Sequence, residues 1–116
     1  MGRDDCLFCR IVRKEIPTKI VLEDSKTLAF EDVKAQAPVH ILIIPKEHIE
    51  KVSDLAEHDI EIVGRLVLAA KNIAKEKGIQ ESGYRIVMNC NRDAGQAVFH
   101  LHLHLLGGRK FSWPPG

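Results

Sequence analysis

Three histidines alternate with leucines near the end of the sequence, at His100, His102 and His104. Successive side chains on a β-strand point to opposite faces, so a strand over residues 100–106 would gather the three imidazoles on one face and bury the leucines. Imidazole ionises near neutral pH and can act as a nucleophile or as a proton carrier. The outer two histidines of a regular strand lie about 13 Å apart, so all three do not readily bind one zinc ion. The pattern favours chemistry by a central histidine over a purely structural or metal-binding cluster.

A second group with chemical potential is the C-x-x-C pair formed by Cys6 and Cys9. The spacing is compatible with zinc binding, with redox chemistry or with coincidence. A thioredoxin-like site would need a βαβ context, which the sequence does not predict, and structural zinc would need two further ligands. The chain has three cysteines, too few and odd in number for a disulfide framework. We therefore expect a reducing, cytoplasmic setting.

A polar loop over residues 91–97 directly precedes the predicted histidine strand. Its Gly95 permits close approach of the backbone, and the amides that follow can point at an anion. A glycine alone more often marks a simple turn. Its place just before the histidines favours an anion site.

The elements that must position these residues follow from the apolar pattern and the turn residues. Predicted strands cover residues 19–23, 27–31, 40–45, 84–89 and 100–106, and predicted helices cover residues 6–14 and 57–77. A parallel sheet would need helical crossovers between successive strands, which are not predicted. The sequence predicts an α+β fold with an antiparallel, meander-type sheet, one long helix and a short N-terminal helix. We expect a single domain over residues 1–116.

The long helix carries apolar residues over a surface wider than one core needs. One stripe consists of Ile60, Val63, Val67, Ala70 and Ala74, and the neighbouring stripe consists of Ile62, Leu66, Ala69 and Ile73. Either the helix is deeply buried, or it covers its own sheet and also meets a second subunit. In a domain of this size we favour the second interpretation, a homodimer formed through the long helix and the adjacent strand.

Charge and hydropathy exclude several classes of partner. The chain has 17 basic and 16 acidic residues and a net charge of +1, so it lacks the electrostatic footprint of a nucleic-acid-binding or membrane-surface protein. No apolar run approaches the roughly 20 residues that cross a bilayer. The charged residues 1–5 lack the apolar centre of a secretion signal. We expect neither nucleic acid nor membrane as a partner.

The order His-φ-His-φ-His-φ-φ, where φ is apolar, resembles the signature of the histidine-triad (HIT) family, and residues 100–106 match it at every position. The similarity extends over nearly the whole chain and points to the Hint-like branch. It is carried further by Cys6-Leu7-Phe8-Cys9, Glu15-Ile16-Pro17, Ala37-Pro38-Val39-His40, Ile44-Pro45-Lys46-Glu47-His48, Gly95-Gln96 and Trp113-Pro114-Pro115-Gly116.

The resemblance implies a purine nucleoside phosphoramidase type of activity. The bond between a nucleoside monophosphate and its leaving group, often an amine, is cleaved through a covalent nucleotidyl-His102 intermediate that water then hydrolyses. His40, His100 and His104 complete the implied catalytic group, with His40 and His104 flanking the phosphate. A backbone carbonyl would hold Nδ1 of His102 and leave Nε2 free to attack. No cofactor is needed for this chemistry.

The resemblance also implies residues that bind substrate, an AMP- or GMP-type purine nucleotide. The implied phosphate-binding residues are Asn89, Gly95, Gln96, Ala97 and Val98, and the implied nucleoside-binding residues are Phe8, Ile11, Phe30, Asp32 and Val33. From the residues alone, the two phenylalanines and the isoleucine fit a core equally well. Asp32 suits the two ribose hydroxyls, because a carboxylate accepts from both. In the related homodimers the tail with Trp113 reaches toward the partner's active site.

Two further implications concern metal and leaving group. By resemblance, a structural zinc ion would be held by Cys6, Cys9, His48 and His100, clamping the N-terminal segment to the sheet. Hint-like proteins usually carry a hydroxyl residue where this chain has Ala97, which removes one side-chain donor near the leaving group.

Two alternative functions stay open. One is a dinucleoside polyphosphate hydrolase, against which the Trp-Pro-Pro-Gly tail argues. The other is a non-enzymatic nucleotide-binding or zinc-dependent interaction module.

Overall fold

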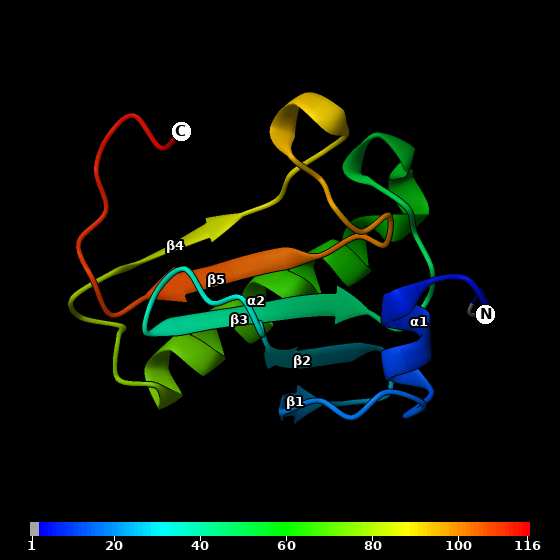
Figure 1. The fold of residues 1–116 in the computed structure, drawn as a ribbon, viewed down its shortest axis with the longest axis horizontal. Helices are drawn as coiled ribbons and strands as arrows, with labels where there is room; N and C mark the ends of the chain where they lie inside the picture. Colours follow the sequence, from blue (N-terminus) through cyan, green and yellow to red (C-terminus); the bar gives the residue numbers. More distant parts are fainter. Residues whose placement is uncertain (1–2) are drawn as a thin grey trace.

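One antiparallel sheet, in the order β1-β2-β3-β5-β4, forms the centre of the structure (Figure 1). The computed structural model describes residues 3–116. The strands are β1 (Ile20–Glu23), β2 (Thr27–Glu31), β3 (Val39–Pro45), β4 (Tyr84–Val87) and β5 (Leu103–Gly107), the helices are α1 (Leu7–Val12) and α2 (Ile60–Glu76), and 3-10 turns span Val52–Asp54, Glu57–Asp59 and Arg92–Ala94. The predicted α+β class, with one long helix and a short N-terminal one, is confirmed.

The first three strands follow one another along the sheet, as a meander requires. The turn between β1 and β2 is fixed by Asp24, whose carboxylate accepts hydrogen bonds from the amides of Lys26 and Thr27, both at 2.8 Å. The meander does not continue to the end of the chain. Helix α2 carries the chain from β3 to the far edge, where β4 lies, and β5 then returns between β3 and β4.

Helix α2 covers one face of the sheet and ends at Glu76, two residues before Gly78, whose φ of +76° suits the residue after a helix cap. Its buried residues are Leu66, Ala69, Ala70, Ile73 and Ala74, which draw on both of the apolar stripes seen in the sequence. They pack with Leu101, Leu103 and Leu105, all at most 2% exposed. The leucines between the histidines therefore form the core, as predicted.

Strand β3 is apolar apart from His40, since both of its faces are covered. Ile41 and Ile43 belong to the core beneath α2, whereas Leu42 and Ile44 belong to a second core beneath α1. Leu42 pairs with His104 of β5 in the sheet register. Every second residue of β3 and β5, in step with Leu42 and His104, faces away from α2, and His40 lies on the same face.

The last strand begins later than expected. The prediction placed residues 100–106 in one strand, but β5 starts at Leu103. The preceding segment leaves the β3 ladder, and its Leu101 amide donates to the carbonyl of Ile49 at 2.6 Å. Side-chain alternation continues through this extended segment, although the ladder hydrogen bonds do not.

Several apolar side chains of α2 and of the edge strand β4 face outward. Ile60 is 71% exposed and Leu68 is 58% exposed on the helix, and Ile86 is 41% exposed on β4. None of the helices in residues 3–116 combines the length and the apolar character needed to cross a bilayer.

Candidate active site and cysteine–histidine cluster

The three alternating histidines divide between two groups of side chains. His104 lies on β5 and His102 lies just before it, with their ring centroids 4.9 Å apart. His100 is fully buried and turns toward the cysteine pair, where its ring lies 5.0 Å from that of His48. Phe8 packs against the rings of both His100 and His102, so His100 lies on the face opposite the leucines, as predicted, but it joins the cysteines rather than His40 and His104.

His102 has a defined ring orientation. Its Nδ1 lies 2.8 Å from the carbonyl oxygen of His100, which can only accept, so Nδ1 carries the proton. The lone pair of the neutral ring is then on Nε2. The edge of the ring packs against Phe8, with centroids 5.2 Å apart, and the residue is 8% exposed. A buried, oriented imidazole with a free lone pair is suited to nucleophilic attack.

His40 of β3 joins His104 on the same side of His102. The Nε2 of His40 lies 3.0 Å from Nδ1 of His104 and 3.4 Å from the carboxylate of Asp32. Burial lowers the pKa of His40, and the Asp32 charge opposes that effect. Burial, with the neighbouring His102 and His40, lowers the pKa of His104 to about 4. The His104 ring is thus neutral at physiological pH.

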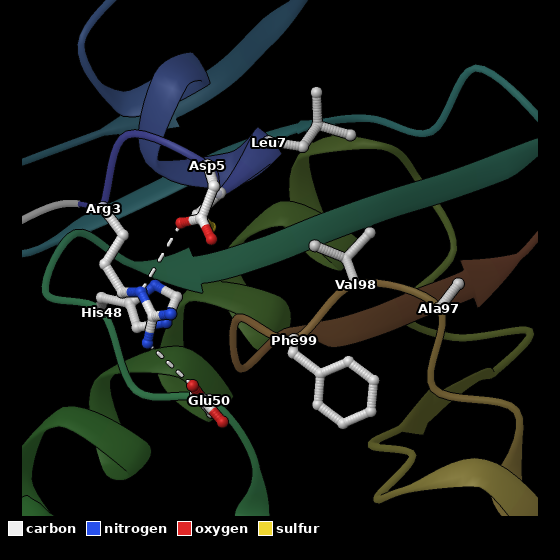
Figure 2. A pocket seen from close by; sticks show the side chains of 9 residues that line it. Arg3, Asp5, Leu7, His48, Glu50, Ala97, Val98 and Phe99 are labelled. Carbon is white, nitrogen blue, oxygen red and sulfur yellow. Dashed lines mark hydrogen bonds and ion pairs between the residues drawn. The ribbon is translucent and has the colours of Figure 1, made fainter.

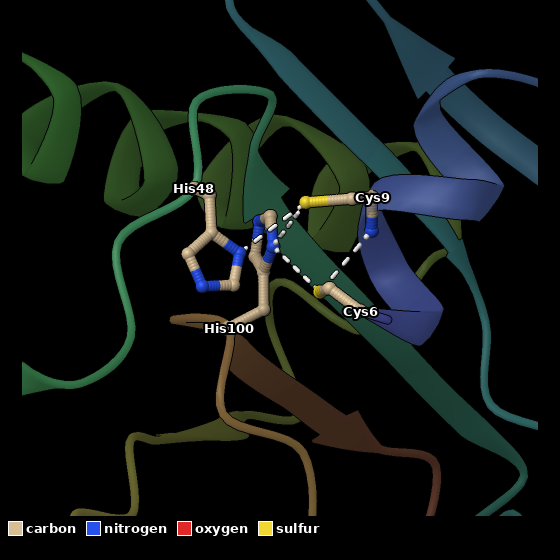
Figure 3. A group of neighbouring side chains, drawn as sticks. All are labelled: Cys6, Cys9, His48 and His100. Atoms are coloured by element: carbon tan, nitrogen blue, oxygen red, sulfur yellow. Dashed lines mark hydrogen bonds between the residues drawn. The ribbon is translucent and has the colours of Figure 1, made fainter. Parts of the chain in front are cut away.

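Cys6, Cys9, His48 and His100 form a compact cluster in which one ligand atom of each lies within 4.8 Å of the others (Figure 3). The Sγ of Cys9 lies 3.2 Å from Nδ1 of His48 and 3.5 Å from Nδ1 of His100, and the Sγ of Cys6 lies 3.4 Å from the same His100 nitrogen. A tetrahedral zinc site separates sulfur and nitrogen ligands by about 3.6 Å. The donor types and their spacing therefore fit zinc.

The surroundings of the cluster also favour metal ligation. The Nε2 of His100 lies 2.8 Å from the carbonyl oxygen of Pro45, so Nε2 carries the proton and the lone pair on Nδ1 points at the sulfurs. Burial lowers the pKa of His100 to about 4 and raises the pKa of the Cys6 thiol. Cys6 also caps α1, since its sulfur accepts from the amide of Cys9 at 3.3 Å.

The loop after the 3-10 turn Arg92–Ala94 leads back toward His102. Gly95 adopts a φ of +84°, a left-handed conformation that glycine tolerates without strain. Gln96 is buried, and its side chain spans the loop: Oε1 accepts from the Asn91 amide, and Nε2 donates to the carbonyls of Glu50 and Val98. Its own amide donates to the carbonyl of Asn91. Every N–H group of Gln96 thus already donates within the protein. Gln96 shapes the loop, but it has no donor available to bind an anion.

The amides of Ala97 and Val98, in contrast, have no hydrogen-bond acceptor within residues 3–116. Successive unpartnered amides after a left-handed glycine are the kind of backbone that binds anions. Asn89, half-buried, lies between β4 and this loop.

The residues expected to hold a nucleoside fall into two groups. Phe8, Ile11 and Phe30 are at most 6% exposed and belong to the core beneath α1. Val33 is 94% exposed, and half-buried Asp32 borders the same open hollow between the end of β2 and the chain before β1. The structure thus brings Phe8 to the ring of His102 and Asp32 to that of His40.

A pocket connects the Ala97 loop with the cysteine–histidine cluster (Figure 2). It is lined by Arg3, Asp5, Cys6, Leu7, His48, Glu50, Ala97, Val98 and Phe99. Arg3 donates to the Glu50 carboxylate at 2.8 Å and lies beside His48 in Figure 2. With burial, the Arg3 charge lowers the pKa of His48. Sequence reasoning missed Arg3 and Glu50, because a long-range ion pair leaves no local signal.

The C-terminal tail passes the start of β4 and then projects away from the sheet (Figure 1). The guanidinium groups of Arg85 and Arg109 lie 5.0 and 4.3 Å from the centroid of the Phe111 ring, and Arg85 also donates to the carbonyl of Ser112. Trp113, which follows Ser112, is 82% exposed and lies outside the histidine site of its own chain.

Comparisons with known proteins show which family and which solved structures this chain is similar to. A profile of the HIT domain matches residues 13–111. The chain is 50% identical over 113 residues to an uncharacterized HIT-like protein of Synechocystis sp., covering 97% of this chain and 98% of that protein. It is 49% identical over 112 residues to a 14 kDa zinc-binding protein of Zea mays, covering 95% and 87%. Its structure is similar to that of a HIT family hydrolase from Legionella pneumophila, with a TM-score of 0.95 and 50% identity over 97% of this chain and 100% of that one.

Proposed function

Since the chain belongs to the HIT domain family, we propose that it is a nucleotide hydrolase that cleaves purine nucleoside phosphoramidates through a nucleotidyl-His102 intermediate. The observation that carries the proposal is the 2.8 Å contact between Nδ1 of His102 and the His100 carbonyl. This contact leaves the Nε2 lone pair available for phosphorus. The name of the Legionella hydrolase supports the reaction class.

The proposed reaction has two displacements at phosphorus. In the first, Nε2 of His102 forms a bond to phosphorus while the phosphorus–nitrogen bond to the leaving amine breaks, and the amine departs with a proton. In the second, water attacks phosphorus, the bond to His102 breaks, and the nucleoside monophosphate is released. Splitting one displacement into two through a covalent intermediate is an established route in enzymes. The rest of the catalysis is positioning and charge stabilisation.

The remaining roles follow from position. The free amides of Ala97 and Val98 would hold phosphate oxygens, with Asn89 and Gly95 shaping that side of the site. His104 and His40 would flank the phosphate, and Asp32 would accept hydrogen bonds from ribose. Phe8, which packs edge to face with the His102 ring, would lie beside the nucleoside.

A direct test is to incubate the protein with adenosine phosphoramidate, quench early and analyse intact mass and peptides. We expect AMP in solution and an adenylyl group on His102. Diadenosine polyphosphate is the comparison substrate, and faster turnover of that compound would contradict the proposed leaving-group class. Binding of AMP without any turnover of either compound would instead support a binding module.

We further propose that Cys6, Cys9, His48 and His100 hold a structural zinc ion, which would join α1 and its N-cap to the chain after β3 and before β5. When bound, zinc would supply a four-way cross-link and no step of the reaction. The relative from Zea mays, named a zinc-binding protein, supports this assignment. The cysteines are free thiols, which suits a reducing compartment such as the cytoplasm.

We also propose a homodimer formed through α2 and the edge strand β4. The exposed Ile60, Leu68 and Ile86 supply apolar surface there, and the unpaired edge of β4 supplies backbone hydrogen-bonding groups. In such a dimer the tail with Trp113, which leaves the sheet near Arg85 of β4, would lie close to the partner and contact its leaving-group side.

A further inference from the structure

The ring of His40 has its orientation set by a backbone amide outside the histidine group. The amide of Gln36 donates to Nδ1 of His40 at 3.0 Å. An amide can only donate, so Nδ1 holds a lone pair and the neutral His40 ring carries its proton on Nε2.

That proton has a defined acceptor. The Nε2 of His40 lies 3.0 Å from Nδ1 of His104 and 3.4 Å from the Asp32 carboxylate, so the shorter hydrogen bond runs from His40 to His104. With Nδ1 of His104 accepting, the neutral ring of His104 carries its proton on Nε2. This second nitrogen is buried and has no partner within residues 3–116. A buried N–H without an acceptor is costly, and such a group at a site indicates a missing ligand.

The direction of these hydrogen bonds also argues against metal binding by the same residues. Asp32, His40 and His104 place ligand atoms within 4.8 Å of one another, which would suit a metal ion. An ion at this position would need the lone pair of His40 on Nε2. The Gln36 amide already engages the lone pair on Nδ1, and a neutral imidazole has only one.

Gln36 is itself held from the C-terminal part of the chain. Arg109 donates through Nε to the carbonyl of Gln36 at 3.0 Å and through Nη1 to the carbonyl of Lys110 at 3.2 Å. The Arg109 guanidinium stacks on Phe111, 4.3 Å from its centroid. The loop that presents the Gln36 amide is therefore fastened to the segment that follows β5.

We propose that the Gln36 amide, held in place by Arg109, directs the hydrogen bonds through His40 to His104, so that His104 presents an Nε2–H donor to an oxygen of the substrate phosphate or its leaving group. Arg109 and Gln36 are positioning residues in this scheme, since neither touches the substrate. The assignment of the ligand rests on the proposed function, whereas the hydrogen-bond direction is a property of the free protein.

The direction can be measured without any substrate. Imidazole nitrogen NMR on the uniformly 15N-labelled protein at neutral pH reports which nitrogen of each ring is protonated. We expect the Nε2–H form for both His40 and His104 in the unaltered protein. An Nδ1–H form of His104, or loss of these signals on adding one further equivalent of zinc to zinc-saturated protein, overturns the proposal.

The role of Arg109 is tested with Arg109→Ala and the matched variant Lys110→Ala, which removes the neighbouring exposed cation. We expect Arg109→Ala to give mixed protonation of His40 and His104 and to lower kcat about fivefold, the effect of one hydrogen bond, with KM changed by less than about twofold. Lys110→Ala should match the unaltered protein in both respects. Identical nitrogen spectra for all three proteins overturn the role of Arg109. If the unaltered protein has no hydrolase activity, the proposed function is wrong, and the spectra still decide the direction of the hydrogen bonds.

Discussion

The backbone carbonyl of His100 contacts His102, whereas its side chain belongs to the cysteine–histidine cluster. Its carbonyl accepts from Nδ1 of His102 at 2.8 Å, while its own Nδ1 lies 3.4 Å from the sulfur of Cys6. One residue therefore belongs both to the cysteine–histidine cluster and to the contact that orients the proposed nucleophile. The position of the backbone at His100 is common to the two sites.

Replacing His102 by alanine should abolish hydrolysis of adenosine phosphoramidate. Because the proposed covalent route depends on this ring, we expect kcat to fall by at least roughly a thousandfold. The control is His58→Ala, since the His58 side chain is 82% exposed and lies away from the site. AMP release measured by chromatography decides the outcome. Comparable rates for the two variants would show that another group attacks phosphorus.

Replacing Cys9 by serine should release zinc and destabilise the fold. Cys9 is 1% exposed and its sulfur contacts both histidines of the cluster, so its loss removes a ligand that water does not replace well. We expect the free energy of unfolding to fall by at least about 2 kcal/mol. Cys90→Ser is the matched control, because that thiol contacts only Ser53 in the hydrogen-bonding of residues 3–116. Metal content of tag-free protein and urea unfolding are the measurements, and an unchanged zinc content in Cys9→Ser would refute the ligand set.

Stability should decrease in mild acid because of His104. The pKa of this residue is about 4 in the folded protein and near 6.5 in an unfolded chain. Between these pH values the unfolded state binds more protons, so the free energy of unfolding falls as the pH is lowered from about 6.5 to 4 and is independent of this group above that range. The contribution is at most about 3 kcal/mol. Urea unfolding from pH 4.5 to 7 should give a shallower pH dependence for His104→Asn than for His58→Asn, and equal slopes would contradict the assignment.

A charge on the outer face of α2 should prevent dimer formation. Leu68 is 58% exposed on this face, and burying a glutamate in its place would carry a large desolvation cost. We expect Leu68→Glu to be monomeric by sedimentation at micromolar concentration. The control is Ile20→Glu, which places the same charge on β1, at the opposite edge of the sheet. If the unaltered protein is already monomeric, or if both variants stay dimeric, the proposed interface is wrong.

The alternation of residues 99–105 was enough to predict that the leucines form the core beneath α2, because alternation is a property of one extended segment. It could not locate the start of β5, since a strand in a sheet also needs ladder hydrogen bonds, and the Leu101 amide instead bonds to Ile49. Nor could it show that α1 and the two cysteines cover His100, because those contacts come from the other end of the chain. The contact between Gln36 and His40 uses a backbone amide, which every residue except proline offers. Such contacts become visible only in three dimensions.

Helix α1 has six residues, too few to be stable in isolation, and its N-terminal cap is the sulfur of Cys6. Phe8, on the first turn, packs against both His100 and His102. Oxidation or alkylation of Cys6 would therefore uncap the helix and loosen the aromatic wall beside His102. Phe8 alone separates the Cys6 thiol from the proposed nucleophile, so oxidative damage at this end of the chain would also lower the proposed hydrolase activity.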